Sequence, residues 1–362
     1  MNKEINSLYI HIPFCDKICD YCDFTKLQYF RNFAASYIKE LKKELTHYYP
    51  KNLKAIYVGG GTPTALEDDL FLELLEMIDP YSKGVEEYTF EANPESLSKE
   101  KIKMLQEHGV NRVSLGVQTT NDAILNKLNR FHTFAQVQEA IKNLKDEGID
   151  NINVDLILGL PHASEKILKE DLKNILDLDI KHISCYGLTV NPHTALFNQG
   201  FKEPNGDELR KYYDIVEETL LKNGFIHYEV SNWVKPGYQS KHNLTYWRNE
   251  QYYGVGLGAS GYINGIRYKN TVNLARYLEG EYVQEREEVS KKDLFTYQIM
   301  LNLRTSEGLD IGYLKEEFGN DLLNNEKVNS FIKNKLLFIK DNHLIATYEG
   351  MMVLDQIILA LI

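Results

Sequence analysis

Three cysteines near the start of the chain are the residues best suited to bind a metal. Cys15, Cys19 and Cys22 follow one another with C-x3-C-x2-C spacing, and the sequence contains four cysteines in all. Three thiolates on one short loop can ligate three irons of a 4Fe-4S cluster and leave the fourth iron open to a small molecule. The alternatives are a structural zinc site, with His11 or a distant residue as fourth ligand, and three ordinary buried cysteines. Because zinc loops more often use C-x2-C or C-x4-C pairs grouped in fours, we favour the cluster.

The sequence around these cysteines resembles the radical S-adenosylmethionine (SAM) enzymes. The segment YIHIPFC, from Tyr9 to Cys15, and the cysteine spacing that follows it carry the resemblance. Within these enzymes the chain is most similar to the coproporphyrinogen-dehydrogenase-like branch, whose members chelate the open iron with the amine and carboxylate of SAM. The resemblance therefore implies a 4Fe-4S cluster on the three cysteines with SAM bound beside it.

Polar residues and glycines recur at the ends of the expected strands, where a parallel barrel assembles its site. Adjacent glycines after the second strand let the backbone approach a ligand closely. The Arg130 guanidinium matches a carboxylate, whereas Asp155, within an apolar run, should be hydrogen-bonded either to a ligand or to a structural partner. The resemblance implies SAM contacts at Tyr9, Tyr21, Gly60, Gly61, Thr62, Glu91, Gln118, Arg130, Asp155 and Thr189.

A second segment, HNLTYW from His242 to Trp247, resembles the H-N-x-x-Y-W signature of the HemW-type heme chaperones. It offers an imidazole that can ligate iron and two large aromatic rings that can lie against a porphyrin face. Considered without the resemblance, one histidine among ten is more often a hydrogen-bonded surface or core group. The resemblance implies contact with heme, with His242 as an axial ligand.

The chain departs from the coproporphyrinogen enzymes at two points. They carry a further cysteine where this chain has Phe24, and a long N-terminal extension that helps to house a second SAM, whereas only a few residues precede the first strand here. We therefore favour a heme chaperone that hands heme to an acceptor protein, for which a membrane cytochrome is one candidate. The alternatives are oxygen-independent oxidative decarboxylation of coproporphyrinogen and a radical enzyme on another substrate.

The segment from Gly254 to Gly261 contains a formal G-x-G-x-x-G. It does not follow a clear strand and open a helix, so we do not predict a dinucleotide site. A tight backbone bend that supports the cofactor pocket is the preferred interpretation.

The first half of the chain must position these residues, and it alternates β-branched runs with helical patterns, which is typical of repeated βα units. Strands are predicted at residues 8–13, 55–59, 88–93, 112–118, 152–160 and 182–190, with helices at 33–48, 70–78, 99–108, 134–147 and 165–178. Six such units can form a partial (β/α)6 TIM-like barrel or a flat doubly wound sheet. The pattern does not separate the two, and we choose the partial radical SAM barrel because the resemblance implies it. Cys185, on the sixth strand, is expected to be a small buried side chain.

The second half is predicted to hold a further helix at residues 207–223 and then short strands and tight loops up to residue 268. From about residue 291 the pattern of helices and two short strands resembles a winged-helix module. Its last ten residues are apolar but too short to span a membrane, so a core-packed helix is expected. The predicted domains are a radical SAM partial barrel at 1–205, a barrel-associated extension with the heme motif at 206–285, and a winged-helix-like α+β domain at 286–362.

Composition limits the remaining choices. With 43% hydrophobic and 26% charged residues the chain is typical of globular proteins, and its net charge of -11 argues against a general nucleic-acid binder. The first six residues hold no long apolar stretch, so we expect neither a secretory signal nor a spanning helix and predict a cytoplasmic protein. Peripheral contact with a membrane during heme transfer and a homodimer are further expectations.

Overall fold

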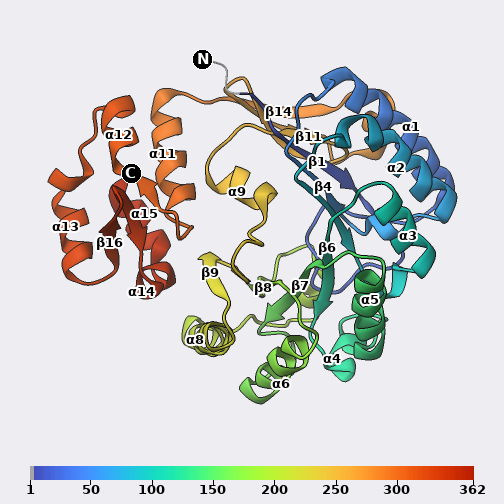
Figure 1. The fold of residues 1–362 in the computed structure, drawn as a ribbon, viewed down its shortest axis with the longest axis horizontal. Coiled ribbons are helices and arrows are strands. Elements are labelled where there is room, and N and C mark those ends of the chain that lie inside the picture. The colour runs from blue at the N-terminus through green and yellow to red at the C-terminus, as the bar shows by residue number, and fades with distance from the viewer. Residues whose placement is uncertain (1–3) are drawn as a thin grey trace.

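The computed structural model describes residues 4–362 as a large α/β sheet domain and a small C-terminal domain (Figure 1). Residues 1–3, which begin the first predicted domain, lie outside the described residues. The large sheet has the strand order β11-β1-β4-β5-β6-β7-β8-β10-β9. Six neighbouring strands at its centre pair in parallel: β1 (Ser7–Ile12), β4 (Ala55–Gly60), β5 (Glu87–Ala92), β6 (Arg112–Gln118), β7 (Asn151–Leu158) and β8 (His182–Gly187). They follow one another in chain order without the reversal that a doubly wound sheet requires, so the partial-barrel prediction is confirmed.

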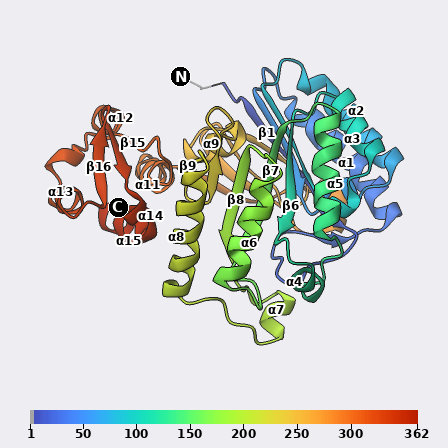
Figure 2. The same cartoon turned by 60° about the horizontal axis from the view of Figure 1, so that its bottom comes forward.

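Helices connect these strands and lie along one side of the curved sheet (Figure 2). The predicted ones are α1 (Arg31–Tyr48), α2 (Asp68–Ser82), α3 (Lys99–Glu107), α5 (Phe134–Asp146), α6 (Glu165–Leu176) and α8 (Gly206–Lys222). In α5 the buried residues Val137, Ala140, Ile141 and Leu144 recur at helical spacing, which explains why the sequence pattern found this helix. Two shorter helices, α4 (Asp122–Lys127) and α7 (Ala195–Asn198), were not predicted because single turns carry too little periodicity.

The third quarter of the chain extends the large sheet at both edges. Strand β11 (Tyr253–Val255) pairs with β1, whereas β10 (Asn232–Val234) pairs with β8 and with β9 (Ile226–Glu229). A separate three-stranded sheet consists of β12 (Ser260–Ile263), β13 (Ile266–Asn270) and β14 (Val283–Glu288), and α10 (Leu274–Leu278) precedes its last strand.

One part of this region was predicted wrongly. The expectation of strands and loops fails at α9 (Lys241–Trp247), which holds the HNLTYW segment. The Ser240 side chain accepts a hydrogen bond from the Asn243 amide and so caps the first turn. The helix brings His242 and Tyr246, four residues apart, onto one face.

The glycine-rich segment between β11 and β12 passes close to the backbone of His11 and the side chain of Thr25. It connects β11 to β12 and opens no helix, as predicted. A Cβ atom at Gly256 would lie 2.5 Å from the His11 carbonyl oxygen, and one at Gly258 would lie 2.6 Å from Thr25 Oγ1. Both residues also have positive φ angles, 105° and 73°. Glycine is therefore favoured at each position both by the backbone conformation and by the lack of space for a side chain.

The C-terminal domain has its own hydrophobic core. It consists of α11 (Lys291–Asn302), β15 (Leu309–Asp310), α12 (Ile311–Phe318), α13 (Glu326–Lys333), β16 (Leu337–Lys340), β17 (His343–Ala346), α14 (Tyr348–Met352) and α15 (Leu354–Leu361). The apolar last segment forms α15 and buries Leu354, Ile357 and Leu361 in that core, as predicted. No helix within residues 4–362 is long and apolar enough to cross a membrane.

Candidate functional site

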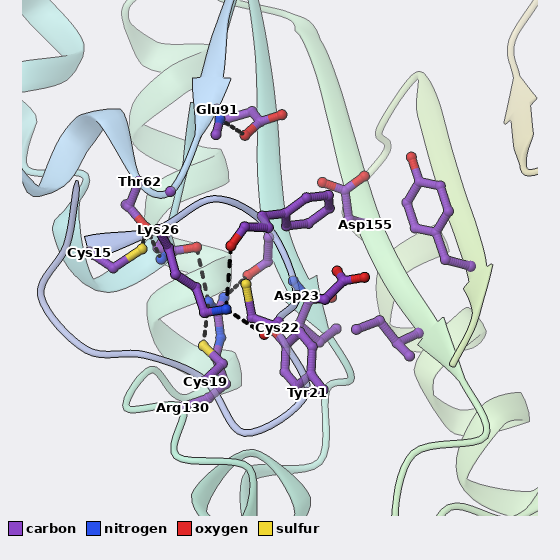
Figure 3. A pocket seen from close by; sticks show the side chains of 18 of the residues that line it. Cys15, Cys19, Tyr21, Cys22, Asp23, Lys26, Thr62, Glu91, Arg130 and Asp155 are labelled. Atoms are coloured by element: carbon purple, nitrogen blue, oxygen red, sulfur yellow. Dashed lines mark hydrogen bonds between the residues drawn. The ribbon is translucent and has the colours of Figure 1, made fainter. Parts of the chain in front are cut away.

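The three cysteines line one cavity at the carboxyl ends of the parallel strands (Figure 3). Cys15 lies on β2 (Phe14–Cys15), which pairs with β3 (Leu27–Gln28) and thereby closes the loop that carries Cys19 and Cys22. The cavity has a volume of about 390 Å³. This volume falls within the range of roughly 300–1,000 Å³ that is common for small-molecule sites.

A series of hydrogen bonds connects two of the thiols through Thr62 and Asn93, which follow β4 and β5, and through Arg130, which follows α4. Thr62 Oγ1 donates to Cys15 Sγ at 3.7 Å and accepts from Asn93 Nδ2 at 2.9 Å. Arg130 Nη1 lies 3.1 Å from Asn93 Oδ1 and 3.7 Å from Cys19 Sγ. This series holds the cysteine loop against the ends of the sheet.

Arg130 keeps unused donor capacity. Its Nη2 donates to the Gly116 carbonyl, but its Nε is buried and has no hydrogen-bond partner among residues 4–362. Buried donors are usually satisfied, so an unsatisfied one beside a cavity points to a ligand acceptor. A carboxylate is the best match for a guanidinium.

Two carboxylates also face the cavity. Glu91 accepts from the Tyr57 hydroxyl at 2.7 Å and from the Gly60 amide at 2.9 Å. Asp155 accepts from Ser114 Oγ at 3.1 Å and from an asparagine amide at 2.8 Å. Burial raises the pKa of both carboxyl groups. Each therefore gains from a hydroxyl or ammonium donor on a ligand.

A β-bulge directs Gln118 into the cavity. The register of β6 against β7 shifts between Gly116 and Gln118, and Gln118 has a φ of 70°. A side chain at Gly116 would crowd this arrangement, since its Cβ would lie 3.1 Å from Gln118 Nε2 and 3.3 Å from Arg130 Nη2. Bulges next to binding sites commonly re-aim a side chain in this way.

Most of the residues predicted to contact SAM line this one cavity. They are Tyr21, Gly60, Gly61, Thr62, Glu91, Gln118, Arg130, Asp155 and Thr189. Sequence reasoning missed Tyr57, Asn93, Ser114 and Tyr186, which line it as well. Ser114 could have been found, because it lies two residues before Gly116, which also lines the cavity, and so shares its face of β6. Tyr9 and His242 do not line this cavity.

His242 is enclosed by protein atoms. The residue is only 1% exposed. Its Nδ1 lies 2.7 Å from Ser7 Oγ, and its Nε2 lies 2.6 Å from the Tyr246 hydroxyl. The rings of Tyr9 and Tyr57 stack against it, with centroids 6.1 and 5.0 Å away. Burial lowers the pKa of the imidazole to about 3. The ring is therefore neutral, and both of its nitrogens are engaged in hydrogen bonds.

A second cavity of about 440 Å³ lies on the other side of these rings. Tyr9 and Tyr246 contribute to its wall, together with Tyr252, Arg267 and Phe24. Phe24, two residues after Cys22, also lines the cysteine cavity, so the two cavities are neighbours.

Comparisons with known proteins agree with this arrangement. The radical SAM superfamily model matches residues 9–175, and the HemN C-terminal domain model matches residues 289–353. The fold is similar to that of coproporphyrinogen III oxidase (HemN) from Escherichia coli, with a TM-score of 0.86 at 19% identity over 99% of this chain and 90% of the other.

Sequence relatives decide the family. A protein of Lactococcus lactis named heme chaperone HemW is 39% identical over 97% of this chain and 95% of its own length. The protein of the same name from Bacillus subtilis is 38% identical over 88% of both chains. This chain belongs to the HemW family of radical SAM proteins.

Membership of the HemW family implies a 4Fe-4S cluster and SAM, and the residues fit both. Three thiols line one cavity together with Arg130, whose Nε is unsatisfied among residues 4–362, and with the carboxylates Glu91 and Asp155. Within residues 4–362 no group of three His, Cys, Asp or Glu side chains is arranged around a single metal ion. In a cubane cluster each cysteine binds a different iron, so the thiols need not meet at one point.

Gly61 leaves space beside Cys15 that a side chain would occupy. A Cβ atom at Gly61 would lie 2.9 Å from Cys15 Sγ and 2.8 Å from the Phe14 carbonyl oxygen. Burial raises the pKa of the Cys15 thiol to about 12. Because metals bind the thiolate, a cluster that forms on this HemW-family chain must displace that proton.

Proposed function

We propose that this chain is a heme chaperone that carries a 4Fe-4S cluster with exchangeable SAM and transfers heme to an acceptor protein. The observation that carries the proposal is the 39% identity over 97% of the chain to a relative named heme chaperone. The HNLTYW segment supports it, since its tyrosine, Tyr246, lines a cavity next to the cysteine loop.

Cys15, Cys19 and Cys22 would hold the cluster. When bound, a cluster with SAM supplies one-electron chemistry. Arg130 would receive the SAM carboxylate at its unsatisfied Nε, and Glu91 and Asp155 would accept hydrogen bonds from hydroxyl or ammonium groups of the same ligand. The tyrosines and the apolar wall of the cavity limit access of water to this ligand.

Heme is the cargo, and α9 is its proposed contact. Tyr246 lines the second cavity. The Nε2 of the neutral His242 is hydrogen-bonded to the Tyr246 hydroxyl and so holds this ring in position. Axial ligation of iron by His242 would require a ring nitrogen to leave its present partner, Ser7 or Tyr246. A tyrosine hydroxyl is itself a heme ligand in some proteins.

The proposal is tested by anaerobic reconstitution followed by iron, sulfide and heme titration on one sample. We expect four irons and four sulfides per chain at full cluster loading, by the stoichiometry of the 4Fe-4S cluster. We also expect a Soret shift on addition of heme that weakens when Tyr246 or His242 is replaced by alanine. A preparation that held only zinc, or bound no heme, would contradict the proposal.

The same preparation distinguishes the chaperone from a coproporphyrinogen decarboxylase. Oxidative decarboxylation of coproporphyrinogen would yield vinyl groups on the tetrapyrrole, detectable by mass spectrometry, and we expect none. The proposed acceptor, with a membrane cytochrome as one candidate, is tested by heme loss from the loaded chain on mixing. The proposed homodimer and the contact with a membrane are tested by sedimentation with and without vesicles.

A further inference from the structure

The second cavity contains one group that the proposed chaperone role does not explain. Arg267, on β13, is the only lysine or arginine among the described residues that line it. The guanidinium lies over the rings of Tyr262 and Tyr297, with its central carbon 4.6 and 4.2 Å from the ring centroids. These rings hold it in place at the junction of the large sheet domain and α11.

The guanidinium is only partly satisfied. Its Nη2 donates to Asn249 Oδ1 at 2.6 Å, whereas its Nε is buried and has no partner among residues 4–362. The Asn249 Nδ2 group is also buried and unpartnered. Arg267 and Asn249 both line the cavity, and the guanidinium has more donors than its bond to Asn249 uses, so a carboxylate in the cavity is the acceptor that suits it best.

Aromatic side chains of the wall suit a flat apolar ring, and Glu250 is the one carboxylate among the described residues that line the cavity. Phe24 is 67% exposed, and Tyr246 and Tyr252 pack edge to face with centroids 4.5 Å apart. The Tyr9 hydroxyl donates to His11 Nδ1, because His11 Nε2 must donate to the Thr25 carbonyl. Burial lowers the pKa of His11 to about 4, so this ring adds no positive charge to the wall.

We propose that the second cavity binds a planar tetrapyrrole by a carboxylate side chain, with Arg267 as the carboxylate anchor and Phe24 against the ring. This inference rests on the proposed heme chaperone role. It adds the cavity in which the heme is bound and the heme group, a propionate, that the protein recognises. A guanidinium that is already positioned by two rings loses little conformational freedom on binding a carboxylate.

The experiment compares heme with heme dimethyl ester, in which both propionates are blocked, in the full-length chain. The wild type is expected to bind free-acid heme about tenfold more tightly than the ester, equal to about 1.4 kcal/mol. Arg267→Gln should remove this preference by weakening the free acid alone. Arg276→Gln is the matched control, because Arg276 is exposed on α10, pairs with Glu281 and does not line the cavity.

The outcomes are distinct. A wild type that binds heme but shows no preference for the free acid would overturn the inference and leave the chaperone role standing. The same holds if Arg267→Gln keeps the preference or weakens both ligands equally, as a purely structural clamp would. A wild type that binds no heme would overturn both proposals.

A second variant covers the case in which Arg267→Gln does not fold. Arg267→Lys keeps the charge and the stem but cannot give two parallel hydrogen bonds, so we expect it to reduce the preference for the free acid. An unchanged preference in this variant would overturn the inference. Urea unfolding without ligand reports separately any loss of the ring contacts.

Discussion

The cysteine cavity and the α9 helix hold the two strongest sequence motifs of this chain, but they present their ligand atoms in opposite ways. In the first, three cysteines, Arg130, Glu91 and Asp155 line one shared cavity. In the second, both nitrogens of His242 are bonded to protein side chains, and the residue is 1% exposed.

The difference follows from the elements that carry the two motifs. Parallel strands end at one edge of the sheet, so the residues that follow them converge without having to pack against each other. Helix α9 instead packs against β4 and the start of β1, where its histidine fills the interior between Tyr9 and Tyr57. A sequence motif can therefore mark residues that contact a ligand or residues that pack behind a ligand site. Four experiments distinguish these two roles.

The largest effect is expected at the cysteine loop. Cys19→Ala removes one of three thiolates that face open space, and we expect complete loss of a stable cluster. Iron, sulfide and the visible spectrum after anaerobic reconstitution measure it. Cys185→Ala is the control, because Cys185 is fully buried on β8 in the hydrophobic core. A Cys19 variant with full iron and sulfide content would show that the loop does not hold the cluster.

The next largest effect is expected for His242 without any heme present. His242→Ala breaks two buried hydrogen bonds and leaves a cavity, which should lower the free energy of unfolding by about 2–4 kcal/mol. Urea unfolding of the ligand-free chain measures this change. The exposed His47→Ala variant should change stability by less than about 0.5 kcal/mol. Equal stability of the two variants would mean that His242 is no structural support.

Arg130 should affect ligand binding more than folding. Arg130→Gln removes the buried donor that we assign to the SAM carboxylate, so SAM affinity of the reconstituted chain should fall by about tenfold or more. Calorimetric titration measures the affinity, with cluster content determined on the same sample. Lys127→Gln, on the exposed side of α4, should bind SAM as the wild type does. Unchanged affinity at full cluster content would refute the assignment.

The smallest effect is the pH dependence that His242 adds. Its pKa is about 6.5 in an unfolded chain and about 3 in the folded one. As pH falls below 6.5 the unfolded state binds the proton first, so stability falls by up to about 1.4 kcal/mol per pH unit until pH approaches 3. Urea unfolding at pH 6.5 and 5.5 should therefore show a drop about 1 kcal/mol smaller for His242→Asn than for the wild type. Equal drops would contradict the burial of a neutral ring.

Much of the barrel was predictable, because buried parallel strands and amphipathic crossover helices leave regular patterns. Glu91, near the end of β5, was accessible for the same reason, whereas the cysteine loop and Arg130 were found from residue type, spacing and the family resemblance. Asn93, which connects Thr62 to Arg130, was missed because its role depends on the orientation of one amide between two strands. Helix α9 was missed because its seven residues are too few for a periodic signal.

The amino-acid sequence was sufficient to predict the alternating strands and longer helices of the barrel, the three-cysteine loop and the family, since these depend on residue type and spacing along the chain. The three-dimensional structure was needed to show that the strands follow one another around a partial barrel, that His242 is enclosed by protein atoms and that Arg267 lines a cavity. The reason is that accessibility and hydrogen-bond partners depend on contacts between distant segments. His242 is bonded to Ser7, 235 residues away, and no local pattern encodes that contact.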